Sequence, residues 1–555
     1  MIFFRKRLVL VFISLLGLIT FSNCGNKNKS FDTRTVFRYN EMGSVSSLDP
    51  AVATNFENIW ACNQLYNGLV QMDDSLKVLP CIAKKWSISP DGLTYTFTLR
   101  NDVYFHDNEA FINGKGRKVT ASDFEFSLNR LYDSKVSSAM SLLDGVNKKF
   151  PGNKNGFEAK NDSTFVIYLK EAFSPFIGIL TMKFFSVVPK EAVEKYGDDF
   201  RRHPVGTGPF QFKFWEEGNQ LAFVKNNNYF EYDGANRLPY LDAVAVSFIK
   251  DKETAFMQFI KGDEDMLSGM DAFNPTEVLD EDGKLKPFYK GKLQLQSQPY
   301  LKTDYFGILV DEKLEIVKNS PLKNKALRKA INYSFDRQKL VKYFRNNVGV
   351  PATAGFLPSG LPAYDPNKII GYNYNPDKVK ELLIEAGYPN GKGLPEITLH
   401  ASSNYIEVLE FFQSQLSENG IKIKISIDND VELKKAIANN NLVFFKKSWI
   451  CDYADEENFM SLFYSKNASP KGFNYTHYNN PEFDKLYERA RFEQNDSIRK
   501  KLYQRMDQMV MNDAPVVPIY YDQVIRLVSN NITNLGTNSM NLLNLKRVKK
   551  QNSLK

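Results

Sequence analysis

The chain has 555 residues, of which 43% are apolar and 14% aromatic, and its formal net charge at pH 7 is +8. This length and apolar content suffice for two or three domains with well-formed cores. No stretch beyond residue 24 is long and apolar enough to span a membrane, so we expect the rest of the chain to be soluble.

The N-terminus combines a basic segment with a short apolar run. Residues 5–7 read Arg-Lys-Arg, and the apolar run over 8–21 is shorter than the roughly 20 residues of a membrane span, which is typical of a secretory signal. Cys24 stands where bacterial lipoprotein signals place the diacylated cysteine, although Asn23 is larger than the residue usual before the cleavage site. We expect a signal peptide over 1–23 and lipid on Cys24, with a plain signal peptide or a single anchoring helix as alternatives.

Secretion limits the possible partners of the mature chain. It places the protein in the periplasm or at the cell surface and separates it from nucleic acid, which we therefore do not expect as a partner. Residues 25–30 are small and polar, as in a flexible tether. We expect the lipidated cysteine and its tether to occupy 24–34, with order beginning near Thr35.

Three cysteines remain after Cys24. In an oxidising compartment Cys62 and Cys81, which are close in sequence, are the expected disulfide pair, and one thiol is left over. Three buried, unpaired thiols are the alternative, and the sequence leaves both interpretations open.

The last basic cluster lies at 546–550, where four of the five residues are Lys or Arg. Contact with acidic phospholipid is one interpretation of this cluster. Because polar chain termini are usually solvated, we expect an exposed tail instead.

Local signals in the first half of the chain predict a strand and a helix. The segment 93–99 alternates larger apolar residues with threonines, a period of two that indicates a half-buried strand. Thr120 is followed three residues later by Asp123, the pattern of a capping box, so a helix is expected to begin there.

The second half alternates strand and helix signals. Asn375-Pro376 predicts a capped helix start and Gly387 its end, and a second helix is expected to stop at Gly420. Further capped helices are expected to open at Ser320-Pro321 and Asn480-Pro481. Strands are predicted near 397–399, 421–427, 442–450 and 515–521, with a helix over 431–439. This order predicts an α/β domain with substantial parallel pairing.

Motifs of several enzyme classes are missing from the sequence. It contains no Gly-x-Ser-x-Gly, no His-Glu-x-x-His and no phosphate-binding loop. The four histidines, at 106, 203, 400 and 477, have no ligand-like spacing. We therefore predict no metal site, no cofactor and no catalytic residue, and expect a non-enzymatic protein.

Acidic residues follow the apolar strand that runs through Trp449. Asp452 stands at the C-terminal end of that strand, where ligand crevices form in α/β folds. Asp455, followed by Glu456 and Glu457, is suited to cap the start of a helix. We assign the cap to Asp455 and contact with a ligand to Asp452.

Several motifs, in matching order over nearly the whole mature chain, resemble the bacterial solute-binding proteins of ATP-driven dipeptide and oligopeptide importers, family 5. Asn67 stands where the family usually has a glutamate, and Glu456 stands where it usually has a proline. The motifs that carry the resemblance are Ser47–Pro50, Leu65–Leu69, Trp86–Arg100 with Phe105–Asp107, Gly206–Phe210 and Ala326–Ile331.

The resemblance implies a fold and a domain organisation. The fold is the α/β, two-lobed fold of periplasmic binding proteins, in the large three-domain variant of type II, with the ligand in a cleft between the lobes. We expect lobe 1 to comprise 35–298 and 510–545, with an inserted subdomain over about 85–200, and lobe 2 to comprise 299–509.

The resemblance also implies a short peptide ligand whose α-ammonium group binds Asp452. Lys446 falls where some oligopeptide binders place an arginine for the peptide carboxylate; a solvated lysine is the alternative, and Trp449 is either a pocket wall or core. The implied partner is an ABC permease complex in the membrane, to which a monomeric, lipid-tethered receptor delivers the peptide. The ligand-binding residues that we predict are Asp452, Trp449, Tyr453, Thr54, Asn55, Phe56 and Lys446.

Three other functions stay open as alternatives. The same fold can bind a metal chelate, haem or an oligosaccharide. A secreted hydrolase that uses Asp452 with a second carboxylate is an alternative from another class, although no second acid can be placed beside it. A surface glycan-binding lipoprotein built from helical repeats conflicts with the strand patterns.

Overall fold

The computed structural model describes residues 35–136, 140–147 and 155–551. The predicted signal peptide, Cys24 and the tether therefore lie outside the described residues. Within the described ranges, no helix combines the length and the apolar character that crossing a membrane requires.

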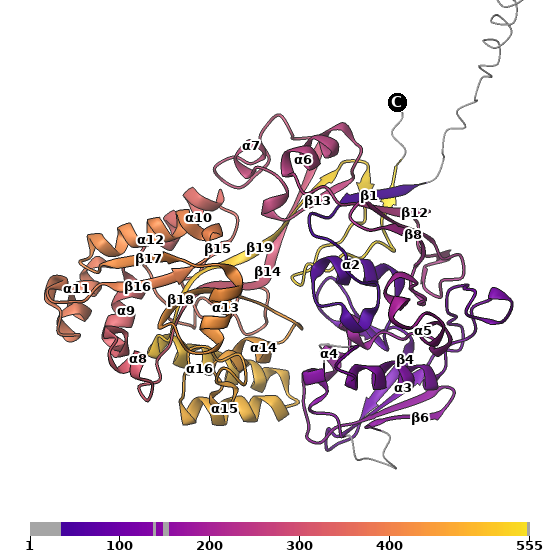
Figure 1. The fold of residues 1–555 in the computed structure, drawn as a ribbon, viewed down its shortest axis with the longest axis horizontal. Helices are drawn as coiled ribbons and strands as arrows, with labels where there is room; N and C mark the ends of the chain where they lie inside the picture. The colour runs from indigo at the N-terminus through magenta and orange to yellow at the C-terminus, as the bar shows by residue number, and fades with distance from the viewer. Residues whose placement is uncertain (1–34, 137–139, 148–154, 552–555) are drawn as a thin grey trace, which may run out of the picture.

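One mixed sheet runs through both lobes of the molecule (Figure 1). The two-residue strand β15 (Val350–Pro351) pairs with β19 at its side. In spatial order the sheet consists of β17 (Ile423–Ile427), β16 (Ile397–Ala401), β18 (Phe444–Ile450), β14 (Leu293–Ile308), β19 (Val516–Ser529), β13 (Met266–Ser268), β1 (Val36–Asn40), β12 (Ala243–Ser247), β9 (Gln220–Lys225) and β8 (Phe210–Glu216).

The long strands β14 and β19 connect the two lobes. They pair antiparallel from Leu293 opposite Ser529 to Gly307 opposite Val516, with register shifts between Pro299 and Thr303 and after Asp304. β14 also pairs with β18 of lobe 2, and β19 also pairs with β13 of lobe 1. The two strands are therefore the shared centre of a sheet whose outer strands belong to different lobes.

Lobe 2, which contains the salmon and orange helices α8 to α13 of Figure 1, has the expected strand–helix alternation, with β16 parallel to both β17 and β18. Asn375 caps its helix as predicted, and Gly387 and Gly420, which follow the two predicted helix ends, have positive φ angles. Its helices are α8 (Glu315–Lys318), α9 (Lys325–Tyr333), α10 (Arg337–Arg345), α11 (Pro376–Glu385), α12 (Ile406–Glu418), α13 (Asp430–Ala438), α14 (Glu456–Met460), α15 (Pro481–Phe492) and α16 (Asp496–Asp513).

The helix expected at Ser320-Pro321 begins later than predicted. Ser320 caps only a short 3₁₀ turn over Pro321–Lys323, and α9 starts after Asn324. The Asn324 side chain accepts hydrogen bonds from the backbone N–H groups of Ala326 and Leu327, which makes it the stronger cap.

Lobe 1, drawn in indigo to magenta in Figure 1 except for its yellow C-terminal strands, carries a second sheet of four antiparallel strands in the order β4-β5-β7-β6. The predicted strand at 93–99 is β5, and the capping box of Thr120 and Asp123 is present at the start of α3. The elements are α2 (Phe56–Leu65), β2 (Val70–Met72), β3 (Val78–Pro80), β4 (Ala83–Ile88), β5 (Thr94–Leu99), α3 (Ala121–Asn129), β6 (Phe157–Asn161), β7 (Thr164–Tyr168), α4 (Phe176–Ile179), α5 (Lys190–Tyr196), β10 (Tyr232–Asp233), β11 (Asn236–Arg237), α6 (Lys252–Lys261), α7 (Pro275–Val278), β20 (Ile532–Thr533) and β21 (Lys549–Lys550).

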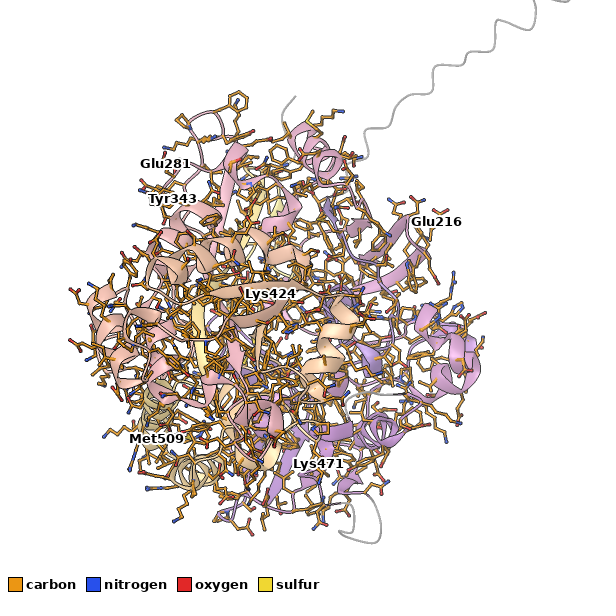
Figure 2. The ribbon with its side chains drawn as sticks, turned by 60° about the vertical axis from the view of Figure 1, so that its left-hand side comes forward. Glu216, Glu281, Tyr343, Lys424, Lys471 and Met509 are labelled. Atoms are coloured by element: carbon orange, nitrogen blue, oxygen red, sulfur yellow. The ribbon has the colours of Figure 1, made fainter. Side chains whose placement is uncertain are left out.

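The two faces of the central sheet bury separate cores in lobe 2. Successive side chains of a strand point to opposite faces. Accordingly, Tyr305 of β14 packs with Phe356 and Phe459, whereas Phe306 packs on the other face with Phe412. Tyr343 of α10, by contrast, is 66% exposed and lies at the outer surface (Figure 2).

The expected disulfide between Cys62 and Cys81 is wrong. Cys62, Cys81 and Cys451 are all free and buried in the structure. The Cys62 thiol lies 3.7 Å from the carbonyl oxygen of Leu48 and is held inside the lobe 1 core. Burial raises the pKa of both thiols, that of Cys81 to about 12, so they behave as small apolar groups.

The C-terminal basic cluster is not the solvated tail that we expected. Lys546 is 8% exposed, and its Nζ lies 2.5 Å from Oε2 of Glu231. Lys550 Nζ lies 2.8 Å from Oδ2 of Asp265, and β21 pairs with β20. Carboxylates of lobe 1, distant in sequence, therefore fix the end of the described chain onto that lobe.

A buried ion cluster lies where β14 and β19 cross between the lobes. Asp304 of β14 is fully buried, with Lys446 Nζ at 2.5 Å and Lys302 Nζ at 3.3 Å. Lys302 also pairs with Asp522 at 2.8 Å, and Asp522 pairs with Arg345 at 2.5 Å. Burial acts to raise the pKa of Asp304, but Lys302 and Lys446 lower it well below its ordinary value, so the group is ionised.

Replacing Asp304 by Asn should destabilise the protein strongly. The change leaves the buried ammonium group of Lys446 without its partner, while Lys302 keeps Asp522, and the lost pairing costs about 3–5 kcal/mol. Urea denaturation measures the loss. The matched control Asp282→Asn removes a carboxylate whose side chain is 76% exposed and 4.0 Å from Lys284, and it should change the unfolding free energy by no more than about 0.5 kcal/mol. Equal stabilities of the two variants would contradict this account of the ion cluster.

Candidate functional site

A cavity of about 370 Å³ lies between the two lobes. Lobe 1 contributes the start of α2 and residues 181–184, and lobe 2 contributes the end of β18 and the loop after it. We call it the interlobe cavity. Its walls include Thr54, Phe56, Lys183, Asp452, Tyr453 and Phe473.

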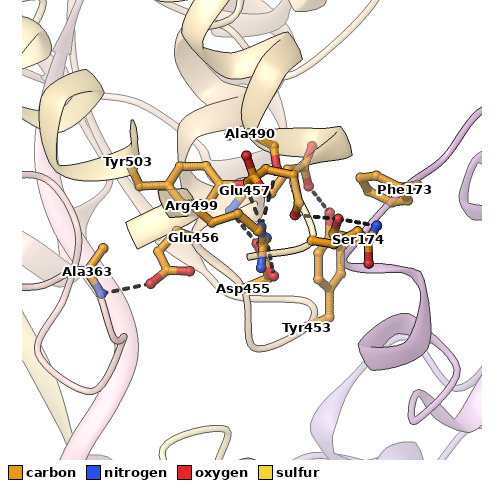
Figure 3. A network of polar contacts seen from close by, with 12 residues as sticks. Phe173, Ser174, Ala363, Tyr453, Asp455, Glu456, Glu457, Ala490, Arg499 and Tyr503 are labelled. Carbon is orange, nitrogen blue, oxygen red and sulfur yellow. Dashed lines mark hydrogen bonds and ion pairs between the residues drawn. The ribbon is translucent and has the colours of Figure 1, made fainter. Parts of the chain in front are cut away.

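The loop that carries Asp452 is held from behind by buried polar contacts. Asp455 caps α14 as predicted, and both of its carboxylate oxygens lie 2.7 Å from Nη2 of Arg499. Glu457 accepts hydrogen bonds from the hydroxyl groups of Tyr453 and Tyr487. Figure 3 shows these contacts of Asp455 and Glu457 converging behind the loop. These contacts fix the conformation of the loop, and the Asp452 side chain takes no part in them.

Asp452 has no compensating charge. Its Oδ2 accepts a hydrogen bond of 3.3 Å from the Asn458 side chain, and among the described residues no ion pair reaches it. The side chain is exposed to the cavity, yet the surrounding protein raises the pKa of Asp452, while the Asn458 hydrogen bond acts to lower it. A carboxylate in a partly dehydrated position, with its charge unpaired, favours the binding of a cation.

Four of the seven predicted ligand-binding residues line the interlobe cavity: Thr54, Phe56, Asp452 and Tyr453. Asn55 does not line it, because its side chain caps α2 by accepting a hydrogen bond of 3.1 Å from the Asn58 N–H.

Trp449 also stands outside the cavity wall. Its Nε1 donates a hydrogen bond of 2.8 Å to Asn458, the residue that also contacts Asp452. Its ring centroid lies 5.5 Å from that of Phe473, which does line the cavity. Trp449 therefore supports two residues of the site from behind.

Lys446 belongs to the ion cluster between the lobes. It is 4% exposed, so the interpretation as a solvated lysine is wrong. Its ammonium is paired with Asp304 and lies 3.9 Å from the centroid of the Tyr405 ring. It lines a separate cavity of about 260 Å³ with Ser402 and Tyr405.

Sequence reasoning missed Lys183, which lines the interlobe cavity from lobe 1. It lies in the 3₁₀ turn Lys183–Phe185, which carries no local signal of a ligand site. The turn is positioned by long-range pairing, in which the bridge of Gly68 with Ser186 joins it to the end of α2. No group of three or more His, Cys, Asp or Glu side chains in the described ranges is arranged to hold a metal ion.

Comparison with known proteins gives matches along most of the chain. The model of the bacterial extracellular solute-binding proteins, family 5 Middle, matches residues 77–471. The glutathione-binding protein GsiB of Salmonella choleraesuis (strain SC-B67) is 30% identical over 499 residues, which cover 88% of this chain and 89% of that protein.

Two solved structures have the same fold. The periplasmic binding protein DppA from Helicobacter pylori, in complex with the peptide STSA, superposes with a TM-score of 0.74 at 26% identity, covering 94% of this chain and 99% of that one. HbpA2 from Haemophilus parasuis gives a TM-score of 0.79 at 23% identity, covering 93% and 100%. The expected fold, two α/β lobes of the periplasmic-binding-protein type, is confirmed.

Proposed function

The chain belongs to family 5 of the bacterial extracellular solute-binding proteins, and from this premise we propose that it captures short peptides by their α-ammonium group. The family supplies solutes to ABC transporters, so the chain is a substrate-binding protein of such a transporter. The peptide as solute, the lipid anchor and the absence of catalysis are our proposals.

The observation that carries the proposal is the unpaired carboxylate of Asp452 in the interlobe cavity. An ammonium group supplies both the opposite charge and charge-assisted hydrogen bonds. DppA holds a peptide, and GsiB is named for glutathione, itself a tripeptide; these ligands support the same class for this chain. The peptide backbone would pair with backbone groups of the cavity as an added strand does, with side chains in water-filled space.

Binding would also favour closure of the lobes, because the ligand contacts both of them. Thr54 and Phe56 come from lobe 1, and Asp452 and Tyr453 come from lobe 2. A ligand that touches both lobes stabilises their closed arrangement by the contacts that exist only there. The strands β14 and β19 are the hinge that we assign to this motion.

One direct contact between the lobes lies beside the site. The Ser174 N–H donates a hydrogen bond of 2.9 Å to the carbonyl oxygen of Arg491, and its hydroxyl donates one of 2.7 Å to that of Glu493. Figure 3 shows Ser174 and Phe173 next to the Asp455 loop. Arg491 also pairs with Glu171 at 3.4 Å, and Tyr453 packs into the hydrophobic core of lobe 1, so opening would break polar and apolar contacts alike.

Outside the cytoplasm, lipid on Cys24 would keep the receptor close to its permease. Tethering raises the effective concentration of the receptor at the membrane without any new contact. We assign no catalytic residue, since Asp452 is the one acidic residue among the described residues that line the interlobe cavity, and we propose that the receptor acts as a monomer.

Replacing Asp452 by Asn should weaken the binding of tri-alanine and other short peptides. The amide keeps the shape of the side chain but removes the charge that pairs with the ammonium, which costs about 2 kcal/mol or more, or roughly 30-fold in Kd. Isothermal titration calorimetry measures the change. The control Asp377→Asn alters a carboxylate that is 90% exposed on α11 and should leave the Kd unchanged. Binding by Asp452→Asn as tight as by wild type would exclude this role.

Replacing Cys24 by Ala should release the protein from the membrane. Fractionation of native cells followed by immunoblotting should find the wild type with membranes and the variant in the soluble fraction. Peptide binding by the released protein should be unchanged, because the residues that line the interlobe cavity all come after residue 50 in the chain. If the variant stayed with the membrane fraction, lipid on Cys24 would not be the anchor.

A further inference from the structure

Lys183 is a second uncompensated charge in the interlobe cavity, opposite in sign to Asp452. It is partly buried, and in the described part of the chain it makes no ion pair and no side-chain hydrogen bond. It lines a smaller recess of about 40 Å³ as well, together with amide side chains from Asn63, Asn67 and Gln71. Lys183 therefore lies in the wall that the recess shares with the interlobe cavity.

The groups around Lys183 do not neutralise it. The nearby thiols of Cys62 and Cys81 stay protonated, since burial raises their pKa values. Lys546, which also lines the recess, is already paired with Glu231. Asp74 lines the recess too, but it is exposed and makes no ion pair with Lys183. Burial lowers the pKa of Lys183, as expected for an ammonium without a partner.

Asn67 contributes an uncharged amide to the recess beside the segment that carries Lys183. The chain from 183 to 187 runs beside it, with the Val187 N–H donating a hydrogen bond of 3.0 Å to the Asn67 carbonyl oxygen. Its side-chain amide accepts a hydrogen bond from Thr207 at 3.1 Å and donates one to Tyr229 at 3.3 Å. An acidic side chain at this position would bring a negative charge to the recess. The asparagine brings none.

We propose that Lys183 binds the carboxylate of the peptide whose ammonium group binds Asp452, so that the site selects short zwitterionic peptides held between the two lobes. This inference rests on the proposed function. Asp452 belongs to lobe 2 and Lys183 belongs to lobe 1. One ligand that carries both an ammonium and a carboxylate group would therefore neutralise a side-chain charge on each lobe. Between them the cavity wall is apolar, with Phe56, Met182, Phe184 and Phe473. The interior thus suits the uncharged middle of a peptide.

The test compares tri-alanine, tri-alanine amide and Ala-Glu-Ala amide by calorimetry on the whole mature protein. Wild type should bind tri-alanine at least tenfold more tightly than its amide. Lys183→Met should bind the two equally, yet keep its dependence on Asp452. Asn67→Asp places a carboxylate in the recess that Lys183 lines, and the hydroxyl groups of Thr207 and Tyr229 can donate hydrogen bonds to it. This variant should also lose much of the preference for tri-alanine over its amide. Lys190→Met, on the 59% exposed lysine at the start of α5, should behave as wild type.

The relative affinities of wild type for tri-alanine and its amide test the assignment of Lys183. If wild type binds tri-alanine and its amide equally, the assignment of Lys183 is wrong while the proposed function stands. If no peptide binds wild type, the proposed function fails and this inference fails with it. Recovery of tight binding by Ala-Glu-Ala amide, lost again in Lys183→Met, identifies an acidic side chain as an accepted source of the carboxylate. Thermal melting should show Lys183→Met at least as stable as wild type, because an unpaired, partly buried ammonium is removed.

Discussion

The pairing of β14 with β19 is the constraint on which the rest of the structure depends. Both strands are long enough to belong to both lobes, and each has a further partner, β18 in lobe 2 or β13 in lobe 1. The residues that follow β18 and the start of α2 are therefore brought to opposite walls of one cavity. The buried Asp304 and its lysine partners hold this junction from inside, and their charges are satisfied without a ligand.

The interlobe cavity brings together two side chains of opposite charge that make no ion pair with the described residues. Asp455 is paired with Arg499, and Arg337, only 2% exposed, donates to the carbonyl oxygens of Pro518 and Asn332. Such partners offset the cost of burying charge. Asp452 and Lys183 make no ion pair with the described residues, although Asp452 accepts a hydrogen bond from Asn458. Because the two charges are opposite in sign and line one cavity, a single bound molecule that carries both charges would pair them.

Local patterns in the sequence predicted local structure well. The caps at Asn375 and Asp455 and the alternation in β5 depend on neighbours within a few residues, and the structure has them. Features that depend on distant partners were not predicted: Lys446 is buried because Asp304, 142 residues away, pairs with it. The free thiol of Cys62 and the packing of the C-terminal segment onto lobe 1 also depend on residues that are distant in the sequence, and they too were not predicted. Asp452 was placed by resemblance and by its position after a strand, whereas Lys183, in a turn positioned by long-range contacts, had no such signal.

The central claim is that a free ammonium group on the ligand neutralises Asp452 between the lobes. Calorimetric titration of the wild-type protein with tri-alanine and with N-acetyl-tri-alanine tests it most directly, since the two peptides differ only at that group. The account predicts that acetylation weakens binding by roughly 30-fold or more, the cost of leaving the carboxylate unpaired. Equal affinity for the two peptides would contradict it.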